Sequence, residues 1–431
     1  MNIAILGYGV EGESTYKYYR AKYPEAIITV YDNNIEPKKS LPSDVKFVGG
    51  VKDFKGIVAD LAIKTPAIPP DLVQVTGEVT TMAREFLKVC PAETIGVTGT
   101  KGKGTTCSLI KSILDSAGKR AWLVGNIGVG AFDVLERIKP SDVVVYELSS
   151  FQLWDMDISP HVAVVLGIEP EHLDVHKDFE DYLGAKANIA KHQKQEDTVI
   201  YLDGNPYSGQ IAKQSQGKAV SYPSDSGAHI YEGKFYYDEQ ELCSVAALKL
   251  PGVHNRENAC AAISAVWPWV KDGSHIERGL ESFYGLPHRL KLVASVNEVQ
   301  YFDDSIATTP GSAIAAIRSF TAPKVMIIGG SDKGATYDEL ASVIMDNLDT
   351  MRRVLLIGAE APKIEAAFKS AGFARYTRYD TSLSMDKLVK TAASVAEPGD
   401  VVILSPACAS FGMFKNYADR GDQFIRAVEG L

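Results

Sequence analysis

Short apolar runs alternate with amphipathic stretches along most of the chain. Near the amino end, apolar segments at 2–9 and 27–32 flank STYKYYRAKY, which predicts the strand-helix-strand opening of a Rossmann-like unit. A second block begins with the strand-like TIGVTG at 94–99, after which a helix is predicted from apolar residues at helical spacing, namely Leu109, Ile110, Ile113, Leu114 and Ala117. Strands are also predicted in DVVVYELSS and HVAVVLGI, whereas the polar, glycine-rich stretch 203–238 predicts loops and short strands outside the main sheet.

The last third of the chain repeats a strand-helix alternation. Its predicted strands are VQYFDD, KVMIIGG, RVLLIGA and DVVILSP, and amphipathic segments lie between them. This alternation predicts a mostly parallel sheet with helices on both faces. We therefore expect an α/β protein of three domains: a Rossmann-like domain at 1–90, a central P-loop ATPase-like domain with a mostly parallel sheet at 91–287, and a Rossmann-like α/β domain at 288–431.

Length, charge and cysteine content narrow the class of protein. A chain of 431 residues exceeds the size at which one core stops growing. The net charge of -9 opposes binding to nucleic acid or an anionic membrane surface. Its five cysteines are widely spaced, which favours a reducing compartment over disulfides or a zinc site. Because neither a leader nor a membrane-spanning run is apparent, we expect a cytoplasmic monomer that binds small molecules.

The first glycine-rich turn is GYGVEG at 7–12. It follows a predicted strand, and Asp32 comes 20 residues after Gly12, at the end of the next strand. This is the spacing of a dinucleotide fingerprint, in which glycines admit a pyrophosphate and the acid binds a ribose. An NAD-dependent oxidoreductase is therefore one hypothesis, beside a structural glycine turn or a different nucleotide.

The second glycine-rich turn, 99–103, also lies between a predicted strand and a helix. In that context backbone N–H groups and the helix dipole bind phosphate, and Lys103 can bridge the outer phosphates. The next residue is Gly104, where a phosphate loop usually has a metal-binding Ser or Thr. The hydroxyl is therefore predicted one step further on, at Thr105 in preference to Thr106.

Acidic and histidine residues follow two predicted strands of the central block. Glu147 ends the strand VVVY, and Glu171, His172 and Asp174 follow the strand VAVVLG. Parallel strands deliver such groups to one edge of the sheet, where open α/β sheets bind ligands. Carboxylates beside phosphates suit Mg²⁺. The plainer interpretations are a helix N-terminal acid for Glu147 and a surface residue for His172.

The chain resembles the Mur ligases over essentially its whole length. The resemblance rests on GTKGKGTT, ELSSFQL, EHLD, YLGAKANIA, GVHNRENACAA, GLPHRL, DDSIATT, GGSDKG and SPACASFGMFKNYADRG. It implies an ATP-dependent, amide-forming enzyme of peptidoglycan synthesis that works through an acyl phosphate, with ATP and two Mg²⁺ as cofactors. The short first block and the SPACAS segment are similar to the branch whose substrates are UDP-N-acetylmuramoyl-L-alanine and D-glutamate.

The same resemblance implies a role for each matching residue. The catalytic set is Lys103, Glu147, His172 and Lys186; the metal set is Thr105, Glu147, His172 and Lys186, the last as a carbamate. ATP contacts are implied for Gly99, Thr100, Lys101, Gly102, Lys103, Gly104, Thr105, Thr106, Asn255, Asn258, Arg289 and Asp304. UDP-substrate contacts are implied for Val10, Glu11, Asp32, Asn33, Asn34 and Asn126, and D-glutamate contacts for Thr308, Lys333, Ser410, Phe411 and Tyr417.

Alternatives remain at this point. A folylpolyglutamate synthase-like ligase is suggested by the Gly-Lys-Gly loop around Gly104, although a block of about 90 residues precedes that loop. Ile306 stands where many D-glutamate-adding members have a lysine, so a non-catalytic UDP-sugar binder is a further alternative. From the residues alone, Lys186 is interpreted as a solvated helix lysine.

Overall fold

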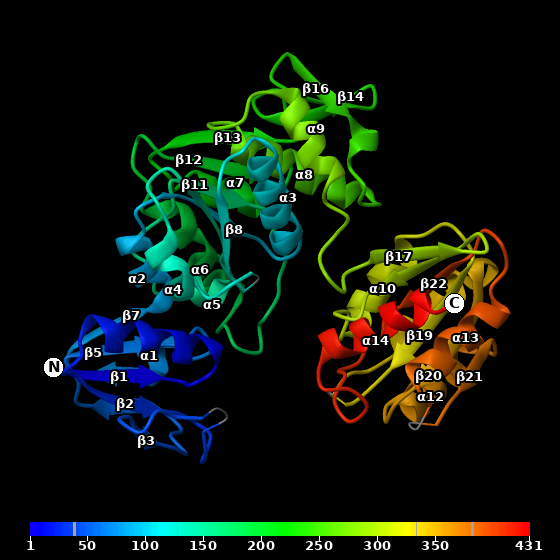
Figure 1. The fold of residues 1–431 in the computed structure, drawn as a ribbon, viewed down its shortest axis with the longest axis horizontal. Helices are drawn as coiled ribbons and strands as arrows, with labels where there is room; N and C mark the ends of the chain where they lie inside the picture. Colours follow the sequence, from blue (N-terminus) through cyan, green and yellow to red (C-terminus); the bar gives the residue numbers. More distant parts are fainter. Residues whose placement is uncertain (38–39, 127, 333, 381–382) are drawn as a thin grey trace. The chain divides into compact units, whose positions relative to one another are not determined.

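The computed structural model describes residues 1–37, 40–126, 128–332, 334–380 and 383–431 (Figure 1). By its internal contacts the chain divides into two compact units. The first comprises Met1–Lys249 and Val253–Phe283, and the second Leu250–Gly252 and Tyr284–Leu431. This division falls within the predicted central domain at 91–287, and the three predicted domain boundaries stay predictions.

The first unit begins with a parallel sheet of five strands in the order β3-β2-β1-β5-β7. These strands are β1 (Asn2–Leu6), β2 (Ile27–Tyr31), β3 (Lys46–Val48), β5 (Leu61–Lys64) and β7 (Glu78–Thr81). Helix α1 (Val10–Lys22) follows β1, helix α2 (Met82–Val89) follows β7, and β4 (Phe54–Ile57) pairs with β6 (Val73–Val75). The predicted Rossmann-like opening is confirmed.

The unit's second large sheet is also parallel, in the order β13-β12-β11-β8-β10-β9. Its strands are β8 (Glu93–Thr98), β9 (Ala121–Gly125), β10 (Val143–Glu147), β11 (Val162–Val165), β12 (Thr198–Leu202) and β13 (Lys218–Tyr222). Every residue of β10 and β11 is buried, as expected for inner strands covered on both faces. We call the carboxyl ends of β8, β10 and β11, with the turns that follow them, the central edge.

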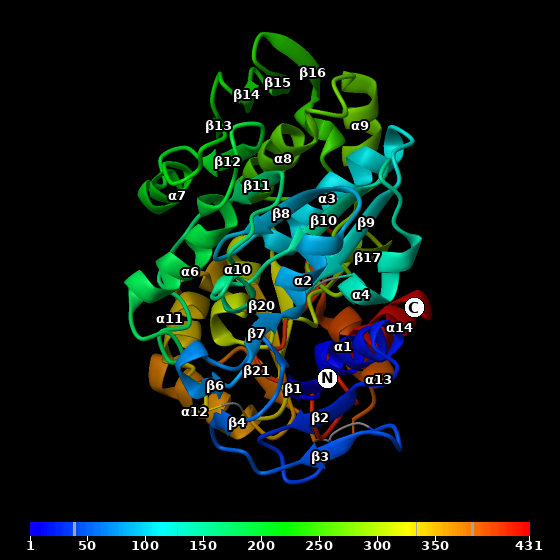
Figure 2. The same ribbon diagram turned by 90° about the vertical axis from the view of Figure 1, so that its left-hand side faces the viewer.

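Helices cover this sheet and place its turns. They are α3 (Lys103–Ser116), α4 (Ala131–Val134), α5 (Ser150–Leu153), α6 (Phe179–Lys191), α7 (Pro206–Ala212), α8 (Val253–Val266) and α9 (Gly273–Glu281). Helices α3, α8 and α9 pack side by side (Figures 1 and 2). Helix α6 begins where Asp178 caps the N–H of Asp181, and α5 begins at a capping box of Ser149 and Gln152.

The stretch 203–238 differs from its prediction. It contains α7 and β13, so part of it completes the main sheet, with Val220 and Tyr222 of β13 buried. Only the three-stranded antiparallel sheet of β14 (Ala228–Tyr231), β15 (Lys234–Tyr237) and β16 (Gln240–Ser244) stands apart. Glycines and serines on either side of β13 interrupt the apolar pattern, so this short strand was not predicted as part of the main sheet.

One hydrophobic core joins both large sheets of the first unit. It contains Ile3 and Tyr19 from the first sheet and its helix, together with Phe86 and Tyr146. Tyr18 stacks on Phe132 with ring centroids 4.0 Å apart. The buried Lys64 ammonium also pairs with Asp155 at 2.8 Å. The glycine turn after β1 is thereby held against the middle sheet.

The second unit is built on a six-stranded sheet in the order β17-β18-β22-β19-β20-β21, parallel except for the β17-β18 pair. Its strands are β17 (Lys291–Val296), β18 (Val299–Asp303), β19 (Lys324–Gly329), β20 (Met351–Ile357), β21 (Tyr376–Arg378) and β22 (Val401–Leu404). Met326 and Ile328 pack with α10 (Pro310–Arg318), α11 (Asp338–Asp346) and α12 (Ala361–Ala371). Val325 and Ile327 face α13 (Met385–Val395) and α14 (Tyr417–Glu429), so both faces are covered, as predicted.

No helix in the described ranges combines the length and apolarity that crossing a membrane requires.

A glycine on α9 makes the packing of α3 testable. A Cβ on Gly279 would lie 2.5 Å from the Cα of Ile113 and 2.9 Å from its backbone nitrogen. We expect Gly279→Ala to lower the free energy of unfolding by about 1–3 kcal/mol, because backbone atoms cannot yield as a side chain would. Gly184→Ala on α6 has open space and should change stability by about +1 kcal/mol at most. Urea unfolding measures the free energy of unfolding of both variants. Equal values for the two variants would contradict the close packing of α9 on α3.

Candidate active site

The second glycine turn leads from β8 into α3. Gly102 caps α3 at φ 86°, and a Cβ there would lie 2.5 Å from the Oδ1 of Asn258. The Thr100 N–H donates to the Gly167 carbonyl at 2.9 Å, and the Thr100 hydroxyl donates to the Glu169 carbonyl at 3.0 Å. The turn is therefore fixed to the segment after β11, with the first N–H groups of α3 at its end.

Two lysines meet at one carbonyl oxygen of this turn. The Lys103 Nζ donates to the carbonyls of Gly99 and Thr100, each at 2.9 Å. The Lys186 Nζ donates to the same Gly99 carbonyl at 2.9 Å and lies 3.4 Å from the Thr98 hydroxyl. Lys186 is 2% exposed, so it is not the solvated helix lysine considered above.

Burial holds the pKa of Lys186 well below its usual value, and the positive charge of Lys103 lowers it further. Glu171 and Glu147 oppose this shift. The Lys186 ammonium also lies 4.8 Å from the centre of the Tyr182 ring. The site therefore favours an uncharged Lys186 amine, or a partner that brings negative charge.

Glu147 is buried at the end of β10, where it is paired in register with Val97 of β8. Thr105 and Thr106 are buried in the first turn of α3. The Thr106 hydroxyl lies 3.4 Å from the Oδ1 of Asn258, whose amide in turn donates to Asn255 at 3.2 Å. Both asparagines of α8 therefore lie beside the glycine turn, and the choice of Thr105 for the metal-binding hydroxyl stays a prediction.

His172 lies in the turn after β11 with a positive φ of 57°. Its exposed ring is 5.0 Å from the Phe151 ring, and its Nε2 is 3.7 Å from Glu171. The sequence prediction missed the buried His176, which bonds to Asp181 and Ser150. Burial lowers the pKa of His176. The four-residue spacing in EHLDVH was the available signal.

The donor set at the central edge suits Mg²⁺. It includes the Thr105 hydroxyl, the Glu147 carboxylate and the His172 imidazole. Within the described part of the chain, no group of three or more His, Cys, Asp or Glu side chains is placed to hold a metal by itself. Mg²⁺ commonly takes few protein ligands and completes its shell with phosphate and water, so the set fits.

The acid that follows the first glycine turn accepts backbone N–H groups from two segments. The Asp32 carboxylate accepts the Tyr8 N–H at 2.7 Å and the Asn34 N–H at 2.8 Å. Asn33 also accepts from the Asn34 amide at 3.0 Å, and Asn126 is exposed after β9. Glu11 accepts from Gln152 of α5 at 3.1 Å, which ties this turn to the central edge. The Val10 side chain lies outside the described residues.

In the second unit, predicted residues gather where β18 and β22 end. The buried Asp304 carboxyl accepts the Leu290 N–H at 3.1 Å and the Ser405 hydroxyl at 2.8 Å, and burial raises its pKa to about 7. The adjacent His288 bonds to Asp303 at 2.6 Å. Arg289 is exposed between His288 and Leu290.

The predicted D-glutamate residues lie partly at the same edge. Ser410 is buried, Phe411 and Tyr417 are exposed, and Thr308 is half-buried. The Tyr417 carbonyl accepts the Ser305 hydroxyl at 2.7 Å. Lys333 lies outside the described residues. The prediction missed Arg420, which is fully buried and donates to the carbonyls of Ser305 at 2.7 Å and Cys408 at 3.2 Å.

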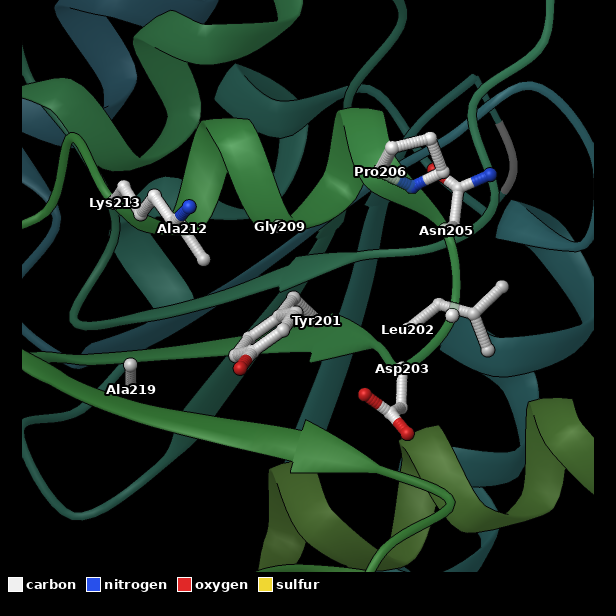
Figure 3. A pocket seen from close by; sticks show the side chains of 10 residues that line it. Tyr201, Leu202, Asp203, Asn205, Pro206, Gly209, Ala212, Lys213 and Ala219 are labelled. Carbon is white, nitrogen blue, oxygen red and sulfur yellow. The ribbon is translucent and has the colours of Figure 1, made fainter.

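A cavity of about 480 Å³ lies elsewhere, between β12, α7 and β13 (Figure 3). Tyr201 and Asp203 line it from the strand side, and Lys213 lines it from the end of α7. None of the predicted site residues lines this cavity.

Comparisons with known proteins show the family of the chain. The Mur ligase middle domain matches residues 97–266, and the Mur ligase glutamate ligase domain matches residues 288–408. The chain therefore belongs to the Mur ligase family. It is similar to the UDP-N-acetylmuramoylalanine--D-glutamate ligases of Acetivibrio thermocellus (36% identity, 100% of this chain and 96% of that protein) and Clostridium perfringens (34%, 100% and 97%).

Solved structures share the fold. UDP-N-acetylmuramate-alanine ligase MurC from Thermotoga maritima matches with a TM-score of 0.63 at 18% identity, covering 100% of this chain and 99% of that one. MurF ligase from the same organism, in complex with ADP, matches with a TM-score of 0.58 at 19% identity, covering 99% and 95%. The oxidoreductase and folylpolyglutamate synthase alternatives are not favoured by the curated relatives.

The burial of the Glu11 carboxyl predicts a pH dependence of stability. Burial raises the pKa of Glu11 from 4.5 to about 7. Between these pH values the folded chain keeps a proton that the unfolded chain has lost. The contribution of the protonated Glu11 carboxyl to the free energy of unfolding is therefore fully present below pH 4.5. About 3 kcal/mol of stability is lost as the pH rises from 4.5 through 7. Glu11→Gln, which still accepts from Gln152, should gain that much over the wild type between pH 4.5 and 8.

Urea unfolding across this pH range measures the gain. The exposed Glu25→Gln is the control and should run parallel to the wild type. A parallel curve for Glu11→Gln would show that its carboxyl is solvated instead of buried.

Proposed function

We propose that this chain joins D-glutamate to UDP-N-acetylmuramoyl-L-alanine, with ATP as the phosphoryl donor. The main support is full-length similarity to D-glutamate ligases together with a central edge that gathers two lysines, a carboxylate and helix N–H groups around a glycine turn. Cytoplasmic location belongs to the proposal, because ATP and nucleotide-linked sugars are cytoplasmic metabolites and all five cysteines are free. The monomeric state stays a prediction.

The proposed reaction has two steps. The terminal carboxylate of the sugar nucleotide attacks the γ-phosphorus of ATP, which gives an acyl phosphate and ADP. The amine of D-glutamate then attacks the acyl carbon, loses a proton, and expels phosphate to leave an amide. A carboxylate is a poor electrophile, so phosphorylation supplies the leaving group, while positioning and charge neutralisation lower the barrier.

The central edge supplies the groups for the first step. Lys103 neutralises the transferred phosphoryl group, and the glycine turn from Gly99 to Gly104 binds phosphate oxygens through N–H groups. Asn255 and Asn258 lie beside this turn and contact the adenine side. Arg289 and Asp304 of the second unit contact phosphate and ribose. Thr105, Glu147 and His172 would hold two Mg²⁺ ions, which supply charge neutralisation between carboxylate and phosphate.

Lys186 has a distinct role in this proposal. Its low pKa favours the free amine, which is the form that reacts with carbon dioxide to give a carbamate. Carbamate formation joins the amine nitrogen to the carbon of carbon dioxide and releases a proton, so it would place an anion beside the Lys103 ammonium and pair the two charges. The carbamate would also present an oxygen ligand to Mg²⁺, which an ammonium cannot do.

The remaining substrates take the other predicted residues. The UDP portion of the sugar nucleotide is assigned to the first glycine turn, with Val10, Glu11, Asp32, Asn33 and Asn34, and Asn126 is assigned to the sugar. Glu11 points to Gln152, so an acid in this turn need not face the diphosphate. D-Glutamate is assigned to Thr308, Ser410, Phe411 and Tyr417, with Lys333 as the partner of its side-chain carboxylate.

An acceptor panel tests the proposed function. The enzyme is incubated with ATP, Mg²⁺ and UDP-N-acetylmuramoyl-L-alanine, and ADP release and product mass are measured for a set of D- and L-amino acids. D-Glutamate should give product at the highest kcat/KM. Product with a different amino acid would correct the specificity, and no ADP with any acceptor would contradict the ligase assignment.

Removing Lys103 tests the phosphoryl-transfer role. We expect Lys103→Ala to lower kcat by about 10²–10³-fold or more, because a charge that stabilises the transition state is lost while little core is removed. Lys111→Ala, on an outer part of α3 where it pairs with Asp115, should keep wild-type kcat. Unchanged turnover of Lys103→Ala in ADP-release assays would exclude this role.

Chemical rescue tests the carbamate. Lys186→Ala should lose activity and recover part of it when formate or acetate is added, because a small carboxylate can fill the space and supply the missing anion. Lys103→Ala, which lacks a cation, should show no recovery with the same salts. The measurement is initial rate against carboxylate concentration, and equal responses of the two variants would count against carbamylation.

A further inference from the structure

His176 is a buried histidine whose role the mechanism above leaves open. It is 2% exposed and lies in the turn after β11, four residues beyond His172. Its ring is enclosed by aromatic side chains, with centroids 5.3 Å from Phe151, 4.2 Å from Trp154 and 5.3 Å from Tyr182. The ring therefore has a fixed orientation.

Both ring nitrogens of His176 have partners on other segments. Nδ1 lies 3.0 Å from the Oδ2 of Asp181 on α6, and Nε2 lies 3.1 Å from the hydroxyl of Ser150 on α5. An ionised carboxylate can only accept, so Nδ1 donates to Asp181. Asp181 itself is held by the Trp154 indole N–H at 3.1 Å and the Lys177 N–H at 3.2 Å. The imidazole is thus held by hydrogen bonds between α5 and α6, which both adjoin the central edge.

Each of these partners leads to a proposed reaction group. Ser150 comes three residues after Glu147, and Asp181 comes five residues before Lys186 on the same helix. The third link is made by the backbone, because the main-chain N–H of His176 donates to the carbonyl of His172 at 2.9 Å. One residue therefore connects the segments that carry Glu147, His172 and Lys186, through its ring to the first and third and through its backbone N–H to the second.

The backbone at His172 shows why such an anchor matters. Its φ of 57° lies in the left-handed region, which residues with a side chain adopt only when the surroundings hold them there. Its carbonyl accepts from the N–H groups of Val175 and His176, so the turn closes on the anchored residue. Loosening His176 would release this turn.

We propose that His176 is a positioning residue of the ligase reaction, which sets the relative placement of Glu147, His172 and Lys186. The proposal rests on the proposed function for the roles of those three residues. It assigns His176 no contact with substrate. By connecting the groups assigned to Mg²⁺, it acts on the metal requirement and on kcat, while D-glutamate binding in the second unit is left unchanged.

Two substitutions separate the effect of the hydrogen bonds of the His176 ring from the effect of its packing among aromatic side chains. His176→Phe keeps a ring in the aromatic enclosure and removes both hydrogen bonds, and His176→Asn keeps an amide donor for Asp181. The matched control is Trp122→Phe, which removes an indole bond to the Asp142 carboxylate at 2.8 Å near the opposite end of β10. This control loses a partly buried hydrogen bond of the same unit, away from the central edge.

Three measurements are made on the full-length chain: kcat and the half-saturating Mg²⁺ concentration, calorimetric binding of a non-hydrolysable ATP analogue with Mg²⁺, and amide hydrogen exchange of 169–176 without ligand. For His176→Phe we expect kcat to fall and the Mg²⁺ requirement to rise by about 10-fold or more, weaker analogue binding, and faster exchange. The KM for D-glutamate should stay within about twofold. His176→Asn should fall between His176→Phe and the wild type, and Trp122→Phe should match the wild type.

A wild-type Mg²⁺ requirement with unchanged exchange in His176→Phe would overturn the proposal. If His176→Phe does not fold, His176→Asn decides in the same way. An equal rise in the Mg²⁺ requirement of Trp122→Phe would also overturn it, because the effect would then reflect general loosening. If the wild type forms no amide, the proposed function fails, while the exchange and analogue-binding results still decide whether His176 holds this turn.

Discussion

The carbonyl oxygen of Gly99 accepts from the side-chain nitrogens of two lysines, and the rest of the site depends on this contact. Lys103 reaches it from the start of α3 and Lys186 from α6. Two cations on one oxygen would repel each other with little water to screen them, and so burial together with the charge of Lys103 holds the pKa of Lys186 well below its usual value. The turn is therefore poised to bind negative charge, whether from a polyphosphate or from modification of Lys186.

The order of the parallel strands and the geometry of the glycine turn produce this contact. Parallel strands β11, β8 and β10 lie side by side, so their exits meet at one edge. Gly102 admits the left-handed N-cap and the close approach of Asn258. Thr100 then ties the turn to the segment that carries His172, and the Glu11–Gln152 bond ties the first glycine turn to the same edge. Both glycine turns of the first unit are thereby connected to the central edge.

The sequence predicted the fold well where hydrophobic period and strand length agree, as in β8, β10, β19 and β22. It predicted the position of Glu147, because an acid ending an apolar strand must emerge at the edge. It could not predict that Lys186 is buried, since the burial of a helix lysine depends on tertiary packing of α6 against β8. His176, Arg420 and Asp32 likewise each have one partner from a segment distant in sequence, namely Ser150, Ser305 and Tyr8. Strand β13 was missed because it is short and flanked by glycines and serines.

The most direct test follows oxygen through the reaction. UDP-N-acetylmuramoyl-L-alanine labelled with ¹⁸O in its terminal carboxylate is converted with ATP, Mg²⁺ and D-glutamate, and the released phosphate is analysed by mass spectrometry. The account predicts one ¹⁸O atom in each phosphate released, because the carboxylate oxygen bonded to phosphorus leaves with it. Amide formation with unlabelled phosphate would contradict the acyl-phosphate route, and with it the role assigned to the two lysines at Gly99.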